Sequence, residues 1–77
     1  VTYIDRTVGD LLAAIEATGH RDNTYIVFTA DHGDMLGEKG MVQKRCFYEW
    51  SARIPLILRF PGGEYGGGRI NAPVSWL

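Results

Sequence analysis

The segment from Tyr25 to Ala30, with the sequence YIVFTA, limits most strongly how this chain can fold. Its residues are mainly β-branched or aromatic, and an extended strand made of them is apolar on both faces. Such a strand has to be covered on both sides, as in a parallel sheet between helices. A second run, Pro55–Phe60 (PLILRF), predicts another strand that ends at Pro61. The two runs predict a covered sheet and therefore an α/β architecture.

The residues before the first strand predict a helix. Its apolar positions recur at helical spacing and form one stripe, made of Ile4, Val8, Leu11, Leu12 and Ile15. Gly19 is expected to end this helix as the C′ residue. Two starts are open: Thr2 and Asp5 form a capping pair, or the helix enters from upstream.

Length and charge limit the possible functions. A chain of 77 residues buries only about 60% of its unfolded surface, and its single cysteine cannot form an internal disulfide. The formal net charge of −1 gives no footprint for nucleic acid or an anionic membrane, and no apolar run approaches the roughly 20 residues of a membrane span. Helix, strand, loop and strand leave unpaired sheet edges. We therefore expect residues 1–77 to be part of a larger domain, incomplete at both ends.

The four residues that follow the first strand are Asp31, His32, Gly33 and Asp34. They lie at the carboxyl end of that strand, where open α/β sheets bind ligands. A carboxylate and an imidazole can converge on one cation there if the chain turns, and Gly33 permits a tight backbone. The alternative is that Asp31 caps a turn and His32 is a surface histidine. Asp34 is either a third ligand or a turn residue.

Residues 35–53 predict a long irregular loop with one helical turn near Tyr48–Ser51. Lys44 in this loop is either solvated or an anion-binding group close to the candidate metal site. Glu49 and Arg53 are spaced for a helical ion pair. Cys46 has no partner motif and is expected to be a buried small hydrophobe. The glycine-rich stretch 62–69 predicts a surface turn or hairpin.

These motifs, taken in order, resemble the sulfatase family of the alkaline phosphatase superfamily. The resemblance covers nearly the whole chain and is most similar to the branch of choline-sulfatases and phosphonate monoester hydrolases. The residues that carry it are Tyr3-Ile4-Asp5, Gly9-x-Leu11-Leu12, Asp22-Asn23-Thr24, Ile26 to Gly33, Leu36 to Gly40, Lys44, Tyr48-Glu49, Arg53 to Leu58, Pro61-Gly62 and Val74-Ser75.

The resemblance implies that residues 1–77 are a C-terminal-side portion of a sulfatase catalytic domain, which is a large α/β/α sandwich, and it implies three site residues. Asp31 and His32 would be two ligands of one divalent cation, and Lys44 would contact the sulfate. Most of the family has Asp-Asn where this chain has Asp-His, and imidazole suits Mn²⁺ better than Ca²⁺, the usual ion of the family. The family nucleophile is a formylglycine formed in a Cys/Ser-x-Pro-x-Arg motif. No such motif occurs here, so this segment is expected to contain no catalytic residue and to be inactive alone.

The implied function is hydrolysis of a small-molecule sulfate ester by a longer protein that includes this segment. The segment's partner would then be the remainder of its own catalytic domain. Two alternatives stay open: a phosphonate monoester or phosphodiester hydrolase of the same superfamily, and a catalytically dead scaffold or binding module. The aromatic residues Phe47, Tyr48 and Trp50 either line a pocket for a cationic substrate or pack the loop against the sheet.

Overall fold

The structure is a computed structural model that describes residues 1–75, so Trp76 and Leu77 of the predicted 1–77 domain lie outside the described residues. The chain divides into two compact units. One contains residues 1–25 and the segment from Arg59 onward, and the other contains residues 26–58. Within residues 1–75, no helix is both long and apolar enough to cross a bilayer.

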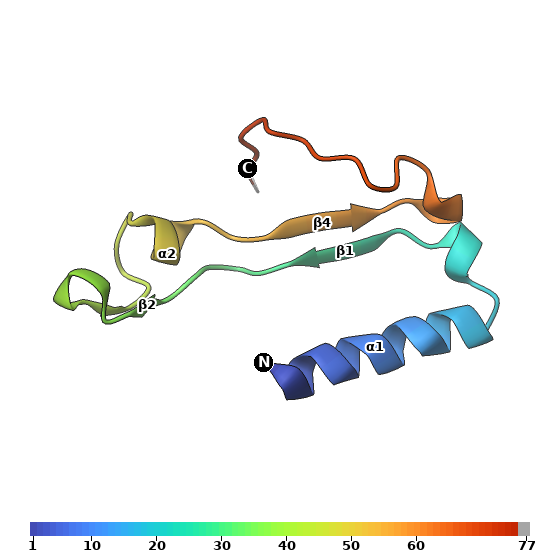
Figure 1. Cartoon of the computed structure of the whole chain (residues 1–77), viewed down its shortest axis with the longest axis horizontal. Coiled ribbons are helices and arrows are strands. Elements are labelled where there is room, and N and C mark those ends of the chain that lie inside the picture. The colour runs from blue at the N-terminus through green and yellow to red at the C-terminus, as the bar shows by residue number, and fades with distance from the viewer. Residues whose placement is uncertain (76–77) are drawn as a thin grey trace. The chain divides into compact units, whose positions relative to one another are not determined.

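The first unit begins with helix α1, Thr2–Ala17 (Figure 1). Val1 is its N-cap residue, and no side chain caps its first turn, so the predicted capping pair of Thr2 and Asp5 does not form. The backbone carbonyl of Val1 instead accepts a 3.0 Å hydrogen bond from the Asp5 N–H. The predicted apolar stripe is present, but none of the residues of α1 is buried.

Helix α1 ends as predicted, with Gly19 in the left-handed region at φ 74°. The Gly19 N–H donates to the Glu16 carbonyl at 3.0 Å, and the His20 N–H donates to the Ile15 carbonyl at 3.1 Å. These two bonds define a Schellman motif, which satisfies carbonyls that the helix end would otherwise leave unpaired. Thr18 adds a side-chain bond, from its Oγ1 to the Ala14 carbonyl at 2.8 Å.

The remainder of the first unit is built from short turns. A 3-10 turn spans Arg21–Asn23 and another spans Pro61–Gly63. Close to these turns in sequence, the Phe60 ring makes two edge-to-face contacts. Its centroid lies 5.5 Å from that of Tyr25 and 5.3 Å from that of Tyr65. The glycine-rich stretch 62–69 forms successive turns with no strand, so the turn prediction is confirmed and the hairpin alternative is wrong.

The second unit contains β1, Ile26–Thr29, and all of β4, Leu56–Arg59, except its last residue, and these are the two predicted strands. They pair in a two-stranded sheet and run in opposite directions (Figure 1). The predicted α/β class is confirmed, whereas the parallel arrangement expected for the first strand is not what this pair shows. An antiparallel pair places the end of β1 beside the start of β4, so the segment between them returns to the same end of the sheet.

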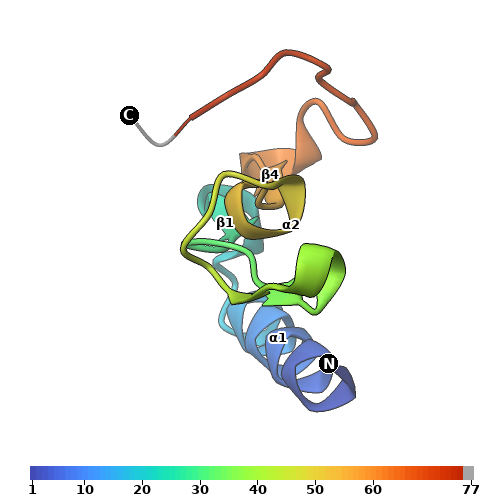
Figure 2. The same cartoon turned by 90° about the vertical axis from the view of Figure 1, so that its left-hand side faces the viewer.

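That segment contains a small hairpin that the sequence did not predict. Strand β2, Met35–Leu36, pairs antiparallel with β3, Val42–Gln43, in the register Met35↔Gln43 and Leu36↔Val42. A 3-10 turn, Glu38–Gly40, joins them. The predicted helical turn is confirmed as α2, Glu49–Ala52 (Figure 2).

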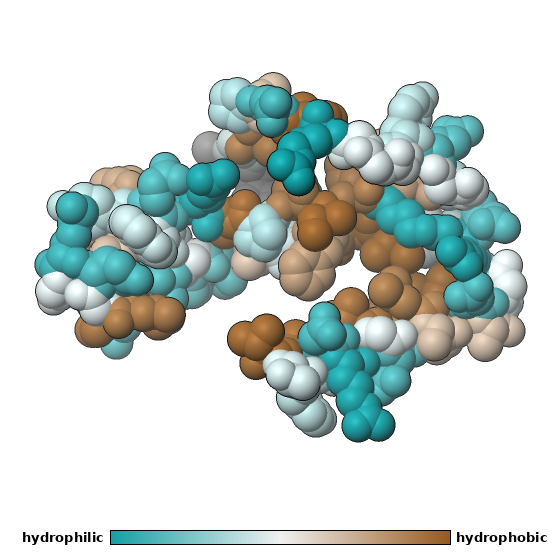
Figure 3. Space-filling view, in the orientation of Figure 1, coloured by the Kyte–Doolittle hydropathy of each residue, from teal (hydrophilic) through white to brown (hydrophobic). Residues whose placement is uncertain are grey.

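Little of the described chain is buried. Met35, at 1% exposure, is the one fully buried apolar side chain among residues 1–75. Figure 3 shows apolar surface gathered over β1 and β4. Their residues Val27, Phe28, Leu56, Ile57 and Leu58 are all exposed. The predicted covered strands therefore keep their apolar faces open within the residues that the structure describes.

Candidate functional site

The predicted metal-site residues follow β1 directly. The Asp31 side chain is 87% exposed, and the His32 side chain is 35% exposed. The His32 N–H donates to Asp31 Oδ1 at 3.0 Å, so the Asp31 carboxylate also fixes the local backbone. Its other oxygen, Oδ2, lies 3.4 Å from His32 Nε2. Asp31 therefore makes a local backbone contact, as the turn alternative predicted. Its carboxylate also lies beside the His32 imidazole, as the metal-site alternative needs.

The imidazole of His32 is oriented by two hydrogen bonds. Its Nδ1 lies 2.7 Å from the Gly33 carbonyl oxygen, which can only accept, so Nδ1 carries the proton. That tautomer leaves the lone pair on Nε2, the atom that faces Asp31. Histidines that bind metals commonly donate their other ring N–H to a backbone carbonyl in this way, because the bond fixes both tautomer and ring orientation.

Lys44 lies beside the His32 ring although it is 12 residues after His32 in the sequence. Its Nζ is 2.7 Å from His32 Nε2. An ammonium has no lone pair, so Lys44 donates and Nε2 accepts, which agrees with the tautomer that the Gly33 carbonyl requires. With Nε2 accepting from Lys44, the 3.4 Å separation between Asp31 Oδ2 and His32 Nε2 is a close approach without a hydrogen bond. The structure thus brings Asp31, His32 and Lys44 together.

Helix α2 packs directly against the backbone that follows His32. The Gly33 N–H donates to the Ser51 carbonyl at 2.9 Å. A Cβ atom built on Gly33 would lie 1.9 Å from the Trp50 carbonyl oxygen, closer than real contacts allow. Glycine is therefore needed here for close approach of two backbone segments. The tight backbone predicted for Gly33 has this cause and not a positive φ, since Gly33 is absent from the left-handed residues.

Asp34 does not complete a metal centre within the described chain. Among residues 1–75, no group of three or more His, Cys, Asp or Glu side chains is placed to hold an ion. That Asp31 and His32 are metal ligands stays a prediction, and Asp34 joins no such group among the described residues.

The other loop residues have structural or surface positions. Glu49 Oε2 and Arg53 Nη1 lie 3.5 Å apart, which confirms the predicted ion pair across α2. Cys46 is a free thiol of intermediate exposure, so the prediction that it is buried is wrong. Phe47, Tyr48 and Trp50 are exposed by 102%, 43% and 54%, so the loop is not packed against the sheet by these rings within the described residues.

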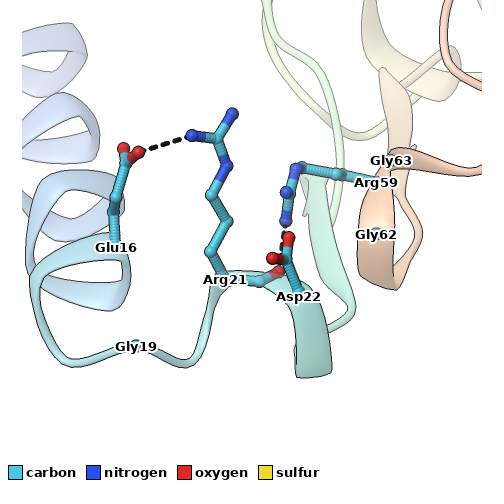
Figure 4. Close-up of a pocket in the computed structure, with 7 residues that line it drawn as sticks. All are labelled: Glu16, Gly19, Arg21, Asp22, Arg59, Gly62 and Gly63. Carbon is cyan, nitrogen blue, oxygen red and sulfur yellow. Dashed lines mark hydrogen bonds and ion pairs between the residues drawn. The ribbon is translucent and has the colours of Figure 1, made fainter.

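The first unit contains a hollow that is lined by none of the candidate site residues. Figure 4 shows its lining, which comprises Glu16, Gly19, Arg21, Asp22, Arg59, Gly62 and Gly63. Its two guanidinium groups already have partners: Arg21 pairs with the Glu16 carboxylate, and Arg59 donates to the Arg21 carbonyl at 2.8 Å. These contacts link Glu16, Arg21 and Arg59 within the first unit, so the cationic groups of the hollow are already paired.

The comparison with protein families agrees with the resemblance that the order of motifs indicates. The family model described as Sulfatase matches residues 1–76. The chain therefore belongs to the sulfatase family.

Its relatives include sulfatases of different named specificity. The chain is 47% identical to the choline-sulfatase of Rhizobium meliloti over 62 residues, which are 80% of this chain and 12% of that protein. It is 43% identical to the N-acetylglucosamine-6-O-sulfatase of Bacteroides thetaiotaomicron over 72 residues, 94% of this chain and 13% of that protein.

A further relative has a broader name. The chain is 37% identical to the multifunctional alkaline phosphatase superfamily protein PehA of Trinickia caryophylli over 75 residues, 97% of this chain and 15% of that protein. The chain thus spans 12 to 15% of the length of these three relatives. No solved structure gives a significant match.

One residue of the site was not predicted. Ser51 is 3% exposed and contacts both the Gly33 backbone and the Lys44 backbone. A serine inside an aromatic and charged loop carries no pattern that marks it as buried. The only available signal was its place in the predicted helical turn.

Proposed function

We propose that the longer protein carrying this chain hydrolyses sulfate monoesters, and that Asp31, His32 and Lys44 belong to its active site. Support comes from the match of residues 1–76 to the sulfatase family, together with the 2.7 Å contact between Lys44 Nζ and His32 Nε2. In the reaction, water is consumed, the ester's sulfur–oxygen bond breaks, and an alcohol and sulfate are released. The nucleophile, a formylglycine by family resemblance, lies outside these 77 residues.

Asp31 and His32 would hold one divalent cation. The donor set fits such an ion in kind, because a carboxylate oxygen and an imidazole nitrogen with a fixed tautomer both present lone pairs. The imidazole favours Mn²⁺ over Ca²⁺, although either would bind the carboxylate. When bound, the cation would supply positive charge that stabilises the charge developing on the ester.

Lys44 would bind the sulfate oxygens. Its ammonium is a compact charge with three donors on a flexible stem, and such a group is suited to a tetrahedral anion. The Nε2 lone pair of His32 cannot serve Lys44 and a cation at once. We therefore expect Lys44 to turn its ammonium from His32 to the substrate when His32 binds the ion, and to stabilise the oxygens by preorganised electrostatics.

The direct test is Lys44→Ala in the full-length protein, assayed on an aryl sulfate. Loss of a preorganised charge contact should lower kcat/KM by roughly 100-fold or more. Lys39→Ala is the matched control, because Lys39 lies 5.3 Å from the Tyr48 ring centroid and contacts neither Asp31 nor His32. Equal rates for the Lys44 variant and wild type would remove Lys44 from the site.

The cation is tested by removal and replacement. Chelation should abolish hydrolysis, and added Mn²⁺ or Ca²⁺ should restore it, with the better ion reporting the donor preference of His32. Full activity in thoroughly chelated protein would contradict a cation at Asp31 and His32.

A second candidate activity is hydrolysis of phosphonate monoesters or phosphodiesters. The observation that favours it is the 37% identity to a relative named as a multifunctional member of the alkaline phosphatase superfamily. Rates on an aryl sulfate, an aryl phosphonate monoester and a phosphodiester, measured on one preparation, decide between the activities. A third possibility is a catalytically dead scaffold or binding module, and it predicts no turnover of any of the three.

A further inference from the structure

Ser51 is the one buried polar residue among those that the structure describes, with 3% of its surface exposed. It lies in the single turn of α2, directly after Trp50 in the sequence and before β4. Burying a hydroxyl is unfavourable unless it is hydrogen-bonded, so the partner of Ser51 identifies what its side chain does.

The Ser51 hydroxyl donates to the backbone carbonyl of Lys44 at 2.5 Å. The same carbonyl accepts the Cys46 N–H at 2.9 Å, so two donors hold it. A backbone fixed in this way sets the point from which the flexible Lys44 side chain extends. The Lys44 ammonium then reaches His32 Nε2 at 2.7 Å.

The backbone carbonyl of Ser51 makes a separate contact on the other side. It accepts the Gly33 N–H at 2.9 Å, next to the His32 ring that binds the Gly33 carbonyl. One buried residue therefore joins the backbone of the two site segments, residues 31–33 and residue 44. The hydroxyl serves Lys44 and the main chain serves Gly33, and these two roles can be separated by mutation.

We propose that Ser51 is a positioning residue for Lys44, acting through its hydroxyl and without touching substrate. The proposal rests on the function proposed above, in which Lys44 binds the sulfate oxygens. Ser51→Ala removes only the hydroxyl contact and keeps the carbonyl that accepts the Gly33 N–H. Ser51→Thr keeps a hydroxyl. Displacing a binding group by about 1 Å lowers rates by up to about 100-fold.

The test is a double-mutant cycle in the full-length protein, assayed on an aryl sulfate. Ser51→Ala should lower kcat/KM by about 10- to 100-fold, Ser51→Thr should restore most of it, and the amount of bound divalent cation should stay unchanged. In a Lys44→Ala background, Ser51→Ala should have no further effect, because the group that it positions is gone. An equal loss in both backgrounds would overturn the proposal, since Ser51 would then act independently of Lys44.

A second measurement does not depend on activity. Amide hydrogen exchange in the peptide that covers Lys44 to Cys46 should be faster in Ser51→Ala than in wild type and Ser51→Thr, because the Lys44 carbonyl loses a donor. If wild type hydrolyses no sulfate ester, the proposed function fails, and this exchange pattern still decides the positioning role: unchanged exchange overturns it. If Ser51→Ala does not fold, Ser51→Cys, with its weak S–H donor, replaces it in both measurements.

Discussion

Gly33 and Ser51 show how much of the candidate site depends on close backbone contact at the scale of single residues. The two are joined by a 2.9 Å hydrogen bond, and the Trp50 carbonyl occupies the space where a Gly33 side chain would begin. Any larger residue at position 33 has to push α2 away. Because Ser51 also binds the Lys44 carbonyl, a shift of α2 would move Lys44 as well.

Gly33→Ala should therefore both destabilise the full-length protein and impair it. Forcing one methyl group into a filled contact costs about 1–3 kcal/mol. Differential scanning calorimetry measures the fall in Tm, and hydrolysis of an aryl sulfate measures the effect on the site. Gly9→Ala in α1 is the control, because a Cβ there meets no atom of the described chain within 4 Å. A Gly33→Ala protein as stable as the Gly9→Ala protein would show that α2 adapts without cost.

The sequence singles out the side chains of the candidate site more clearly than it predicts the contacts that hold them. Asp31, His32 and Lys44 stand out by residue type and by their place after a strand or in a long loop, and the structure brings them together. Ser51 does not stand out, because its burial results from how α2 packs and not from local pattern. The reason for a glycine at position 33 could not be predicted either, because the backbone of Trp50 and Ser51, 17 and 18 residues away in sequence, fills the space of a side chain.

At the scale of elements, helix α1 is the part that local sequence determines most fully. Its apolar stripe and its C′ glycine were both predicted, because each depends on residues within one or two turns. Its first turn was not, since the backbone of Val1 does what a Thr2 side chain was expected to do. The antiparallel direction of β4 was also missed, because an apolar run specifies burial but not strand direction.

Gly19→Ala should weaken the end of α1 in the full-length protein. An alanine held at a φ near 74° is in the left-handed region, which lowers the free energy of unfolding by about 1–2 kcal/mol. Chemical denaturation measures the change in the free energy of unfolding. Gly19→Asn is the matched variant and should lose less, since asparagine tolerates this region. Equal stability of all three proteins would mean that the Schellman motif is not under strain with a side chain present.

At the scale of the whole described chain, residues 1–75, many more apolar side chains are exposed than buried. Met35 is its one fully buried apolar residue within the described range, whereas the strands β1 and β4 and the stripe of α1 are open to solvent. Open apolar faces of this extent mark surfaces that pack against other protein. This agrees with the proposal that the chain's main partner is the remainder of a sulfatase catalytic domain.

The isolated 77-residue chain should therefore show no cooperative thermal unfolding. Burial of so little apolar surface cannot offset the conformational entropy of about 1–2 kcal/mol per residue that folding removes. Near-ultraviolet circular dichroism during heating is the measurement, with the full-length protein as the control. A sharp transition in the isolated chain would contradict this prediction.

Because β1 pairs with β4, the chain between them is a loop whose two ends are held together. Two stretches of this loop should differ in how well they tolerate inserted residues. The turn between β2 and β3, from Gly37 to Met41, ends in a hairpin tip where doubling the loop would cost only about 0.6 kcal/mol of closure entropy. In the stretch from Lys44 to Ser51, one hydrogen bond joins the first residue to the last. An inserted residue would break this bond, so the length of the stretch is fixed. In a library of length variants, insertions should survive selection for activity in the first stretch and be purged from the second.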